Sequence, residues 1–282
     1  MSRTSPTLRR RELSKRLKEL REAAGVTAPE AAEALGCSID KIHWIERGEW
    51  NRPRWRDVRD LLDRYRVTDE RLREYLMQLA REGGQKDWWH PYRKMLSEAY
   101  STYIAFEGDA DELLTFELAV IPGLLQTEDY ARALIRKGPA ELDDADIEKR
   151  VQIRTERQRI LVGDDPARLF AVIDEAALRR TVGGPDVMRA QLQHLIKMAA
   201  QPNVTLQVIP FSVGPHPGTG GRFTIISFPE EGSDAVYIET IAGELLIESE
   251  GVGSYRRAFR RLNAEALSSE DTIALIGRMV DS

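Results

Sequence analysis

Three stretches within the first eighty residues have apolar residues at intervals of three and four, with charged residues between them. This spacing predicts three amphipathic helices, of which the first extends from Leu8 to Arg21. Thr68 or Asp69 is placed to cap the last one. The apolar positions are Leu13, Leu17 and Leu20 in the first stretch, Val58, Leu61, Leu62 and Tyr65 in the second, and Leu72, Leu76 and Leu79 in the third.

The segment from Val26 to Gly48 has the pattern of two short helices joined by a tight turn. Thr27 is placed to cap the first helix, and Pro29 lies in its first turn, where a missing N–H is tolerated. Gly36 can adopt a positive φ after that helix, and Ser38 is placed to cap the second one. The segment therefore predicts a helix-turn-helix.

In the second helix of this pair, Ile42 and Ile45 form the expected buried edge. The remaining side chains are expected to face outward, and this surface would enter a groove of duplex DNA. These outward positions are Ile39, Asp40, Lys41, His43 and Trp44.

After Gly83, helical stretches alternate with short strands. The expected helices cover Asp87 to about Phe106, Leu124 to Gly138, about Ala145 to Leu161, Pro185 to Ala200, about Ser254 to Leu267, and Glu270 to Val280. The expected strands are Leu113 to Ile121 and the segments RLFAVIDE, VTLQVIP, GRFTIISF, AVYIET and ELLIES, which begin at Arg168, Val204, Gly221, Ala235 and Glu244.

These patterns predict an all-α helix-turn-helix domain of five helices, followed by an α+β domain with a mainly antiparallel sheet of about five or six strands. The expected divisions are a flexible N-terminus at 1–7, the helix-turn-helix domain at 8–82 and an α+β regulatory or partner-binding domain at 83–282.

Charge differs between the two expected domains. Residues 1–80 contain 18 Lys and Arg against 14 Asp and Glu, whereas residues 81–282 contain 23 against 32. A locally basic N-terminal domain suits a polyanion such as DNA, and an acidic remainder suits a protein partner.

Several classes of protein are not expected. The chain lacks an apolar stretch of about 20 residues and the apolar core of a secretory signal, so we expect a cytoplasmic protein without a membrane span. Cys37 is the only cysteine and the four histidines are scattered, so we expect no disulfide, metal site or cofactor.

Three features of the sequence resemble parts of catalytic sites. They are the loop GPHPGTGG with His216, the carboxylates Asp174 and Glu175, and Glu239 near Glu244. The loop lacks the Lys-Ser or Lys-Thr of a phosphate-binding loop, and no nucleophile has a recognisable setting near the histidine. We therefore expect a binding protein rather than an enzyme.

The pattern A-x3-G-x5-I from Ala32, followed by I-E-x-G from Ile45, resembles repressor-type helix-turn-helix regulators of the XRE family. Four longer motifs extend the resemblance over nearly the whole chain: PGLLQTEDYARAL from Pro122, RTERQRIL from Arg154, IPFSVGPHPG from Ile209 and VYIET from Val236. Together they resemble the antitoxin-like transcriptional regulators of high-GC Gram-positive bacteria. The resemblance implies DNA binding and a small partner protein encoded by a neighbouring gene.

The expected DNA-binding residues combine the caps, the outward surface and nearby cations. We also expect a homodimer, because two heads can read two half-sites on double-stranded DNA. The proposed DNA contacts are Arg9, Arg10, Arg11, Thr27, Ser38, Ile39, Asp40, Lys41, His43, Trp44 and Arg47. Arg9 to Arg11 form either a basic arm along phosphates or the solvated side of the first amphipathic helix, and both alternatives remain open. The residues proposed for a partner or effector are Trp88, Trp89, Tyr92 and His216.

An alternative remains open at the helix-turn-helix. The family commonly has Gln at the position of Ala28 and Arg or Ser on the outward face of the second helix, whereas this chain has Ile39, Asp40, His43 and Trp44. Exposed Ile and Trp side chains are also typical of protein-binding surfaces. The alternative is an adaptor protein whose helix-turn-helix binds DNA weakly or without sequence specificity.

Overall fold

A computed structural model describes residues 6–50, 53–84, 88–138, 141–228, 234–240, 242–248 and 251–281. The chain divides into two compact units, Met1–Arg93 and Lys94–Ser282, and each is described by itself. The first is all-helical and the second combines helices with one sheet, which confirms the predicted fold class.

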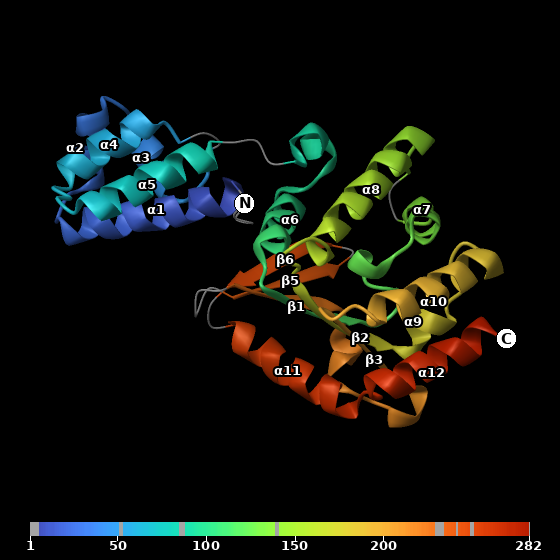
Figure 1. Cartoon of the computed structure of the whole chain (residues 1–282). Coiled ribbons are helices and arrows are strands. Elements are labelled where there is room, and N and C mark those ends of the chain that lie inside the picture. The colour runs from blue at the N-terminus through green and yellow to red at the C-terminus, as the bar shows by residue number, and fades with distance from the viewer. Residues whose placement is uncertain are drawn as a thin grey trace. The chain divides into compact units, whose positions relative to one another are not determined.

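The first unit has five α-helices among its described residues (Figure 1). They are α1 (Pro6–Ala23), α2 (Ala28–Leu35), α3 (Ile39–Glu46), α4 (Trp55–Arg64) and α5 (Glu70–Gly83). Their apolar stripes meet in one core, in which Leu13, Leu17, Leu62 and Leu76 are fully buried. The predicted stripes therefore face the core, and Asp69, rather than Thr68, is the residue that caps α5.

Of the two alternatives, the basic arm is wrong, because Arg9, Arg10 and Arg11 lie inside α1. The helix begins at Pro6, two residues before the predicted start at Leu8, so Pro6 and Thr7 are helical, and the rest of the predicted flexible N-terminus lies outside the described residues. The N-terminal part of α1 packs along α5. Arg10 donates a hydrogen bond to the carbonyl of Gly83 at 2.9 Å, and Arg9 forms an ion pair with Glu82 at 2.8 Å. Arg9 and Arg10 are therefore placed by a helix–helix contact, and Arg11 lies beside Gly48.

The second unit contains helices and strands, and the 3-10 turn η1 spans the boundary between the two units. The helices are α6 (Glu98–Asp109), α7 (Glu128–Arg136), α8 (Asp144–Arg157), α9 (Glu175–Arg179), α10 (Pro185–Ala199), α11 (Val252–Glu265) and α12 (Ser269–Val280). The strands are β1 (Glu112–Glu117), β2 (Arg168–Asp174), β3 (Val204–Ile209), β4 (Phe223–Ser227), β5 (Ala235–Thr240) and β6 (Gly243–Glu248). The 3-10 turns are η1 (His90–Met95), η2 (Gly123–Leu125), η3 (Gln158–Leu161), η4 (Phe211–Val213) and η5 (Pro217–Gly220).

The described strands form one mixed sheet in the order β3-β2-β1-β4-β5-β6. The pairs β1–β2 and β2–β3 are parallel, and the pairs from β1 through β4 and β5 to β6 are antiparallel. Antiparallel pairs are thus in the majority, as predicted. The parallel pairs are connected through helices, as parallel strands require.

The two faces of this sheet have different neighbours. Phe116 of β1, Ile225 of β4 and Val236 of β5 share a core with Phe259 and Leu262 of α11. Because side chains alternate along a strand, the strand residues next to Phe116, Ile225 and Val236 point to the opposite face of the sheet. In Figure 1, α11 and α12 lie on one side of the sheet, and α6, α7 and α8 lie on the other.

Two predicted elements are shorter than expected. The strand predicted to reach Ile121 ends at Glu117. Ile121 donates its N–H to the Tyr130 hydroxyl and accepts a hydrogen bond from Gln126, so side chains take the place of a strand neighbour. The predicted helix from Leu124 starts as α7 at Glu128, after η2.

The predicted helix from residues 87 to 106 is wrong as a continuous element. The described part consists of η1 and the separate helix α6. Ser97 has an extended backbone and accepts a hydrogen bond from the N–H of Tyr100, so it starts a new helix. Similarly, the helix predicted over residues 145–161 continues beyond Arg157 only as the 3-10 turn η3.

Candidate functional site

Local hydrogen bonds cap both helices of the α2–α3 pair. Thr27 and Glu30 form a capping box at the start of α2. Gly36 follows α2 with φ of 58°, a conformation that glycine adopts without steric penalty. Ser38 then accepts a hydrogen bond from the N–H of Lys41 and caps α3. The predicted helix-turn-helix is therefore present.

The helix α3 is held from one side and exposed on the other. Ile42 and Ile45 are buried, and Glu46 forms a bidentate ion pair with Arg21 of α1, at 2.5 and 3.0 Å. On the outer side, Ile39 is 44% exposed and Trp44 is 37% exposed. Asp40 and His43 are exposed beside them. This outer side is available to a partner.

The two cations predicted beside this surface have partners within the chain. Lys41 forms an ion pair with Asp57 of α4 at 2.9 Å, and Arg47 forms one with Glu49 at 2.8 Å. Water reaches both pairs and weakens their attraction, so a phosphate can compete for each cation. The DNA contacts of Lys41 and Arg47 stay predictions.

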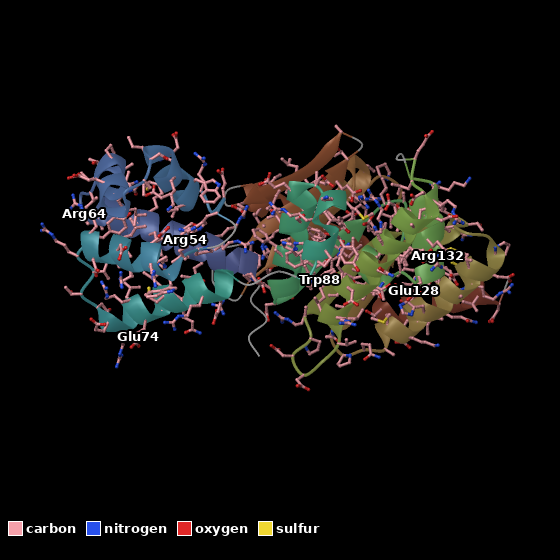
Figure 2. All side chains as sticks on the ribbon, turned by 90° about the horizontal axis from the view of Figure 1, so that it is seen from above. Arg54, Arg64, Glu74, Trp88, Glu128 and Arg132 are labelled. Atoms are coloured by element: carbon pink, nitrogen blue, oxygen red, sulfur yellow. The ribbon has the colours of Figure 1, made fainter. Side chains whose placement is uncertain are left out.

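A basic and aromatic cluster at the start of α4 was not assigned from the sequence. It consists of Arg54, Trp55, Arg56 and Arg59, with both Arg56 and Arg59 lying 5.5 Å from the ring centre of Trp55. Arg54 and Arg64 mark the two ends of α4 (Figure 2). The pair Lys41–Asp57 joins α3 to this first turn. The run of Trp and Arg after Gly48 was the available sequence signal.

The proposed partner or effector residues lie at two separate places. Trp88, Trp89 and Tyr92 belong to the first unit, with Trp88 41% exposed and Trp89 buried against it edge to face. His216 belongs to the second unit and is buried. Its Nε2 lies 3.0 Å from Asp174, and its Nδ1 accepts a hydrogen bond from the N–H of Gly218.

His216 thus organises its own loop. A Cβ atom at Gly218 would collide with the ring of Phe116, so the loop packs closely on β1 through a glycine. None of the four proposed residues lines either of the two cavities described next. Their contact with a partner or effector stays a prediction.

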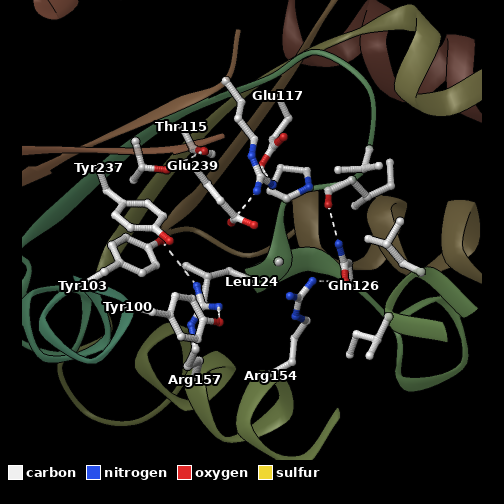
Figure 3. A pocket seen from close by; sticks show the side chains of 18 of the residues that line it. Tyr100, Tyr103, Thr115, Glu117, Leu124, Gln126, Arg154, Arg157, Tyr237 and Glu239 are labelled. Atoms are coloured by element: carbon white, nitrogen blue, oxygen red, sulfur yellow. Dashed lines mark hydrogen bonds and ion pairs between the residues drawn. The ribbon is translucent and has the colours of Figure 1, made fainter. Parts of the chain in front are cut away.

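The second unit contains a cavity of about 430 Å³ on the face of the sheet opposite α11 (Figure 3). Its floor is formed by alternate residues of β1, β4 and β5, including Thr115, Glu117, Thr224, Tyr237 and Glu239. Its walls come from α6, η2, the end of α7 and α8. The main wall residues are Tyr100, Tyr103, Pro122, Gly123, Leu124, Gln126, Ile135, Arg150, Arg154 and Arg157.

Two of the lining arginines are neutralised by carboxylates. Arg157 binds Glu107 through two hydrogen bonds of 2.7 and 2.6 Å, and both residues are buried. Arg222 forms ion pairs with Glu239 and, at 3.5 Å, with Glu117. Arg157 also donates a hydrogen bond to the hydroxyl of Tyr100 at 2.6 Å.

Four polar atoms of the cavity lining are buried without a hydrogen-bond partner among the described residues: Glu117 Oε2, Tyr237 Oη, Arg150 Nε and Arg154 Nε. Only 8% of Glu117 and 6% of Tyr237 is exposed. Burial raises the pKa of Glu117 to about 7, and Glu239 adds to this increase, whereas Arg222 and Arg154 oppose it. Buried polar groups are normally hydrogen-bonded, so four unpaired polar atoms in the lining of one cavity are unusual.

The cavity was not predicted, although sequence signals existed. Three of the four motifs behind the family resemblance supply its lining: residues 122–134 contribute Gly123 and Gln126, residues 154–161 contribute Arg154, and residues 236–240 contribute Tyr237 and Glu239. These segments are far apart along the chain. Nothing in one segment alone indicates that they meet.

Within the described part of the chain, no helix has the length and apolar character needed to cross a bilayer. Nor do the described residues include a group of three or more His, Cys, Asp or Glu side chains that could hold a metal ion.

Two family models match the chain. One, described as a helix-turn-helix domain, matches residues 12–76, and the other, described as a domain of unknown function (DUF5753), matches residues 100–278. No curated protein and no solved structure matches the chain. The first match supports a DNA-binding regulator. Because the second match covers more than half of the 282 residues, the chain belongs to the DUF5753 family, here joined to an N-terminal helix-turn-helix domain.

Proposed function

We propose that this protein is a transcriptional regulator of the repressor-type, antitoxin-like class that binds duplex DNA near its own gene through α3. The observation that supports this most is the capped α2–α3 pair, whose second helix leaves Ile39, Asp40, His43 and Trp44 outward. Side chains in these positions reach base edges when such a helix enters the major groove. A cytoplasmic location is part of the proposal, since the protein must reach DNA.

Phosphate contacts come from around this helix. Lys41 and Arg47 are close to its two ends, and Arg54 and Arg56 precede and follow the first residue of α4. Among the described residues, no carboxylate lies within 4.0 Å of Arg54 or Arg56, so their charge is available to DNA. Thr27 and Ser38 present the two helix N-termini, which favour phosphate oxygens.

The test is a fluorescence anisotropy titration of the full chain on DNA from its own promoter region at several salt concentrations. The double variant Arg54→Gln/Arg56→Gln removes two phosphate contacts and should reduce the log-log salt slope by about two units. The control Arg66→Gln/Arg71→Gln removes two exposed charges, one just after α4 and one in the first turn of α5, and should leave the slope unchanged.

A second candidate is an adaptor whose α3 surface binds protein. It is favoured by the exposed apolar side chains of Ile39 and Trp44 and by the ion pairs that hold Lys41 and Arg47. If promoter and scrambled DNA bind with equal affinity at every salt concentration, the regulator proposal fails and the adaptor takes its place.

We also propose that the second unit dimerises the protein and binds a small protein encoded by a neighbouring gene. General DNA-binding logic supports the dimer, because two heads can read two half-sites about one helical turn apart. The acidic balance of residues 81–282 and the family resemblance support the protein partner. A full-length monomer at tens of micromolar in light scattering would refute the dimer.

Coupling between the protein partner and DNA has its own test. If the partner protein changes the affinity for DNA by some factor, thermodynamic linkage requires that DNA changes the affinity for the partner protein by the same factor. The neighbouring gene product is co-purified and DNA is titrated with and without it. An unchanged DNA affinity with tight partner binding would refute the coupling.

We propose no catalytic role and no cofactor. The pair Asp174–His216, which most resembles a catalytic arrangement, is used inside the fold: Asp174 caps α9, and both nitrogens of His216 have partners in the loop or the strand end.

A further inference from the structure

The cavity between the sheet and α8 has the composition of a binding site. We propose that it binds a small organic acid with an apolar body and a hydrogen-bond donor at the end opposite its carboxylate. This proposal concerns residues 94–282 alone and goes beyond the proposed function. It would stand or fail independently of DNA binding.

The carboxylate of the ligand is assigned to Arg150 and Arg154 of α8. These residues lie one helical turn apart, and both line the cavity. Among the described residues, no carboxylate pairs with either of them within 4.0 Å, in contrast to Arg157 and Arg222. The guanidinium of Arg154 is positioned by a hydrogen bond of 2.8 Å to Gln126.

Arginine suits this role for two reasons. Its planar guanidinium matches a carboxylate through two parallel hydrogen bonds. The buried Nε atoms of Arg150 and Arg154 are without a partner in the described structure and would be satisfied by such an anion. The attraction is also stronger in a cavity with few water molecules than at the surface.

Glu117 is assigned as the residue that accepts a hydrogen bond from the ligand's donor group. It lies across the cavity from Arg154 (Figure 3). One carboxylate oxygen lies 3.5 Å from Arg222, and the other, Oε2, has no partner among the described residues. A ligand hydroxyl or amine would donate to Oε2. The hydroxyl of Tyr237, also unpartnered, offers a second contact on the same sheet face.

Apolar side chains also line the cavity and can contact the body of the ligand. These side chains include Leu113, Leu124, Leu134, Ile135, Leu142 and Leu169. The volume of about 430 Å³ is within the range of small-molecule pockets. A second cavity of about 310 Å³ shares Arg150, Arg154 and Glu239 with the first, so the two adjoin at the predicted carboxylate position.

The first experiment uses matched ligands with the full chain. Straight-chain ω-hydroxy acids, from ω-hydroxyhexanoate to ω-hydroxydodecanoate, are titrated by isothermal calorimetry, because a series of lengths finds the best span. For the best length, the diol without a carboxylate should bind at least tenfold more weakly. The parent acid without a hydroxyl should bind about three- to tenfold more weakly.

The second experiment uses variants with unchanged folds, checked by circular dichroism. Arg154→Gln should weaken binding of the ω-hydroxy acid at least tenfold, whereas Arg159→Gln, an exposed arginine just beyond α8, should not. Glu117→Met should remove the preference for the hydroxy acid over the parent acid.

Several results would overturn the proposal. They are the absence of binding for every member of the series at millimolar concentration, equal binding of the acid and the diol, and binding that Arg154→Gln leaves unchanged. The comparison of acid with diol needs no variant, so the test remains decisive even if Arg154→Gln does not fold.

Discussion

Glu117 is the last residue of β1 and lies on the cavity face of the sheet, almost completely buried. The groups that act on it are Arg222, Glu239 and Arg154, and its charge in turn affects Tyr130. Burial dominates, because removing a carboxylate from water disfavours its charged form. The pKa of Glu117 is therefore raised to about 7 from its ordinary value of 4.5.

This shift predicts a pH dependence of stability. Between about pH 4.5 and 7 the folded protein keeps a proton on Glu117 that the unfolded chain releases, so the free energy of unfolding falls as pH rises through this window. The loss is up to about 3 kcal/mol. Glu117→Gln cannot titrate, so its stability relative to the unmodified protein should increase from pH 5 to pH 8. Urea unfolding of both proteins at four pH values measures this, and parallel curves would contradict it.

The buried group of Arg157, Glu107 and Tyr103 is a second prediction at the residue scale. Arg157 of α8 binds Glu107 of α6 twice, and the Tyr103 hydroxyl donates to Glu107 at 2.7 Å. Glu107→Gln leaves the buried guanidinium without its counter-charge and should destabilise the protein by about 3–5 kcal/mol. Removing both charges, with Glu107→Gln/Arg157→Met, should destabilise it by less than the sum of the single changes. Chemical denaturation of all three variants tests this, and additive effects would contradict it.

At the scale of elements, α3 depends on its cap. Ser38 has an extended backbone and accepts a hydrogen bond from Lys41 N–H at 3.3 Å. Ser38→Ala removes this acceptor and should destabilise the first unit by about 1 kcal/mol. Ser38→Asp keeps an acceptor and should remain within a few tenths of a kcal/mol of the original.

Tryptophan fluorescence during urea unfolding is the measurement for Ser38, because the five tryptophans lie between Trp44 and Trp89, all in the first unit. Equal midpoints for the alanine and aspartate variants would show that the cap contributes nothing. Gly36 is a further requirement of this turn, since its φ of 58° is unfavourable for other residues.

At the scale of the whole molecule, the two units have separate cores. One is built from the five N-terminal helices, and the other from the sheet and α11. We therefore predict two unfolding transitions. Tryptophan fluorescence should follow only the first unit, while far-UV circular dichroism should follow both, so that the two curves differ. Coincident curves would show that the chain unfolds as one cooperative body.

The sequence alone determined the helix-turn-helix. Thr27, Gly36 and Ser38 act on backbone groups within three or four residues of themselves, and Ile42 and Ile45 follow the period of a helix. Information of this kind is local, so it can be recognised without knowing what surrounds the segment. The class of the second unit was also determined by periodicity, because strands and helices have different repeats. The exact division between the predicted domains, at 82 and 83, stays a prediction.

Tertiary structure decided which side chains act together. The sequence left open whether Arg9, Arg10 and Arg11 form an arm or belong to the first helix, and the structure places them in α1, which packs against α5. The sequence placed His216 among possible effector contacts, and Asp174 holds that ring inside its loop. The cavity combines residues from 100 to 239, contributed by helices, strands and a turn. Alternation along β1 puts Thr115 and Glu117 on one face of the sheet, and this can be predicted from the sequence. Which helices cover each face depends on contacts between segments that are distant along the chain. These contacts place α11 on one face and the arginines of α8 on the cavity face.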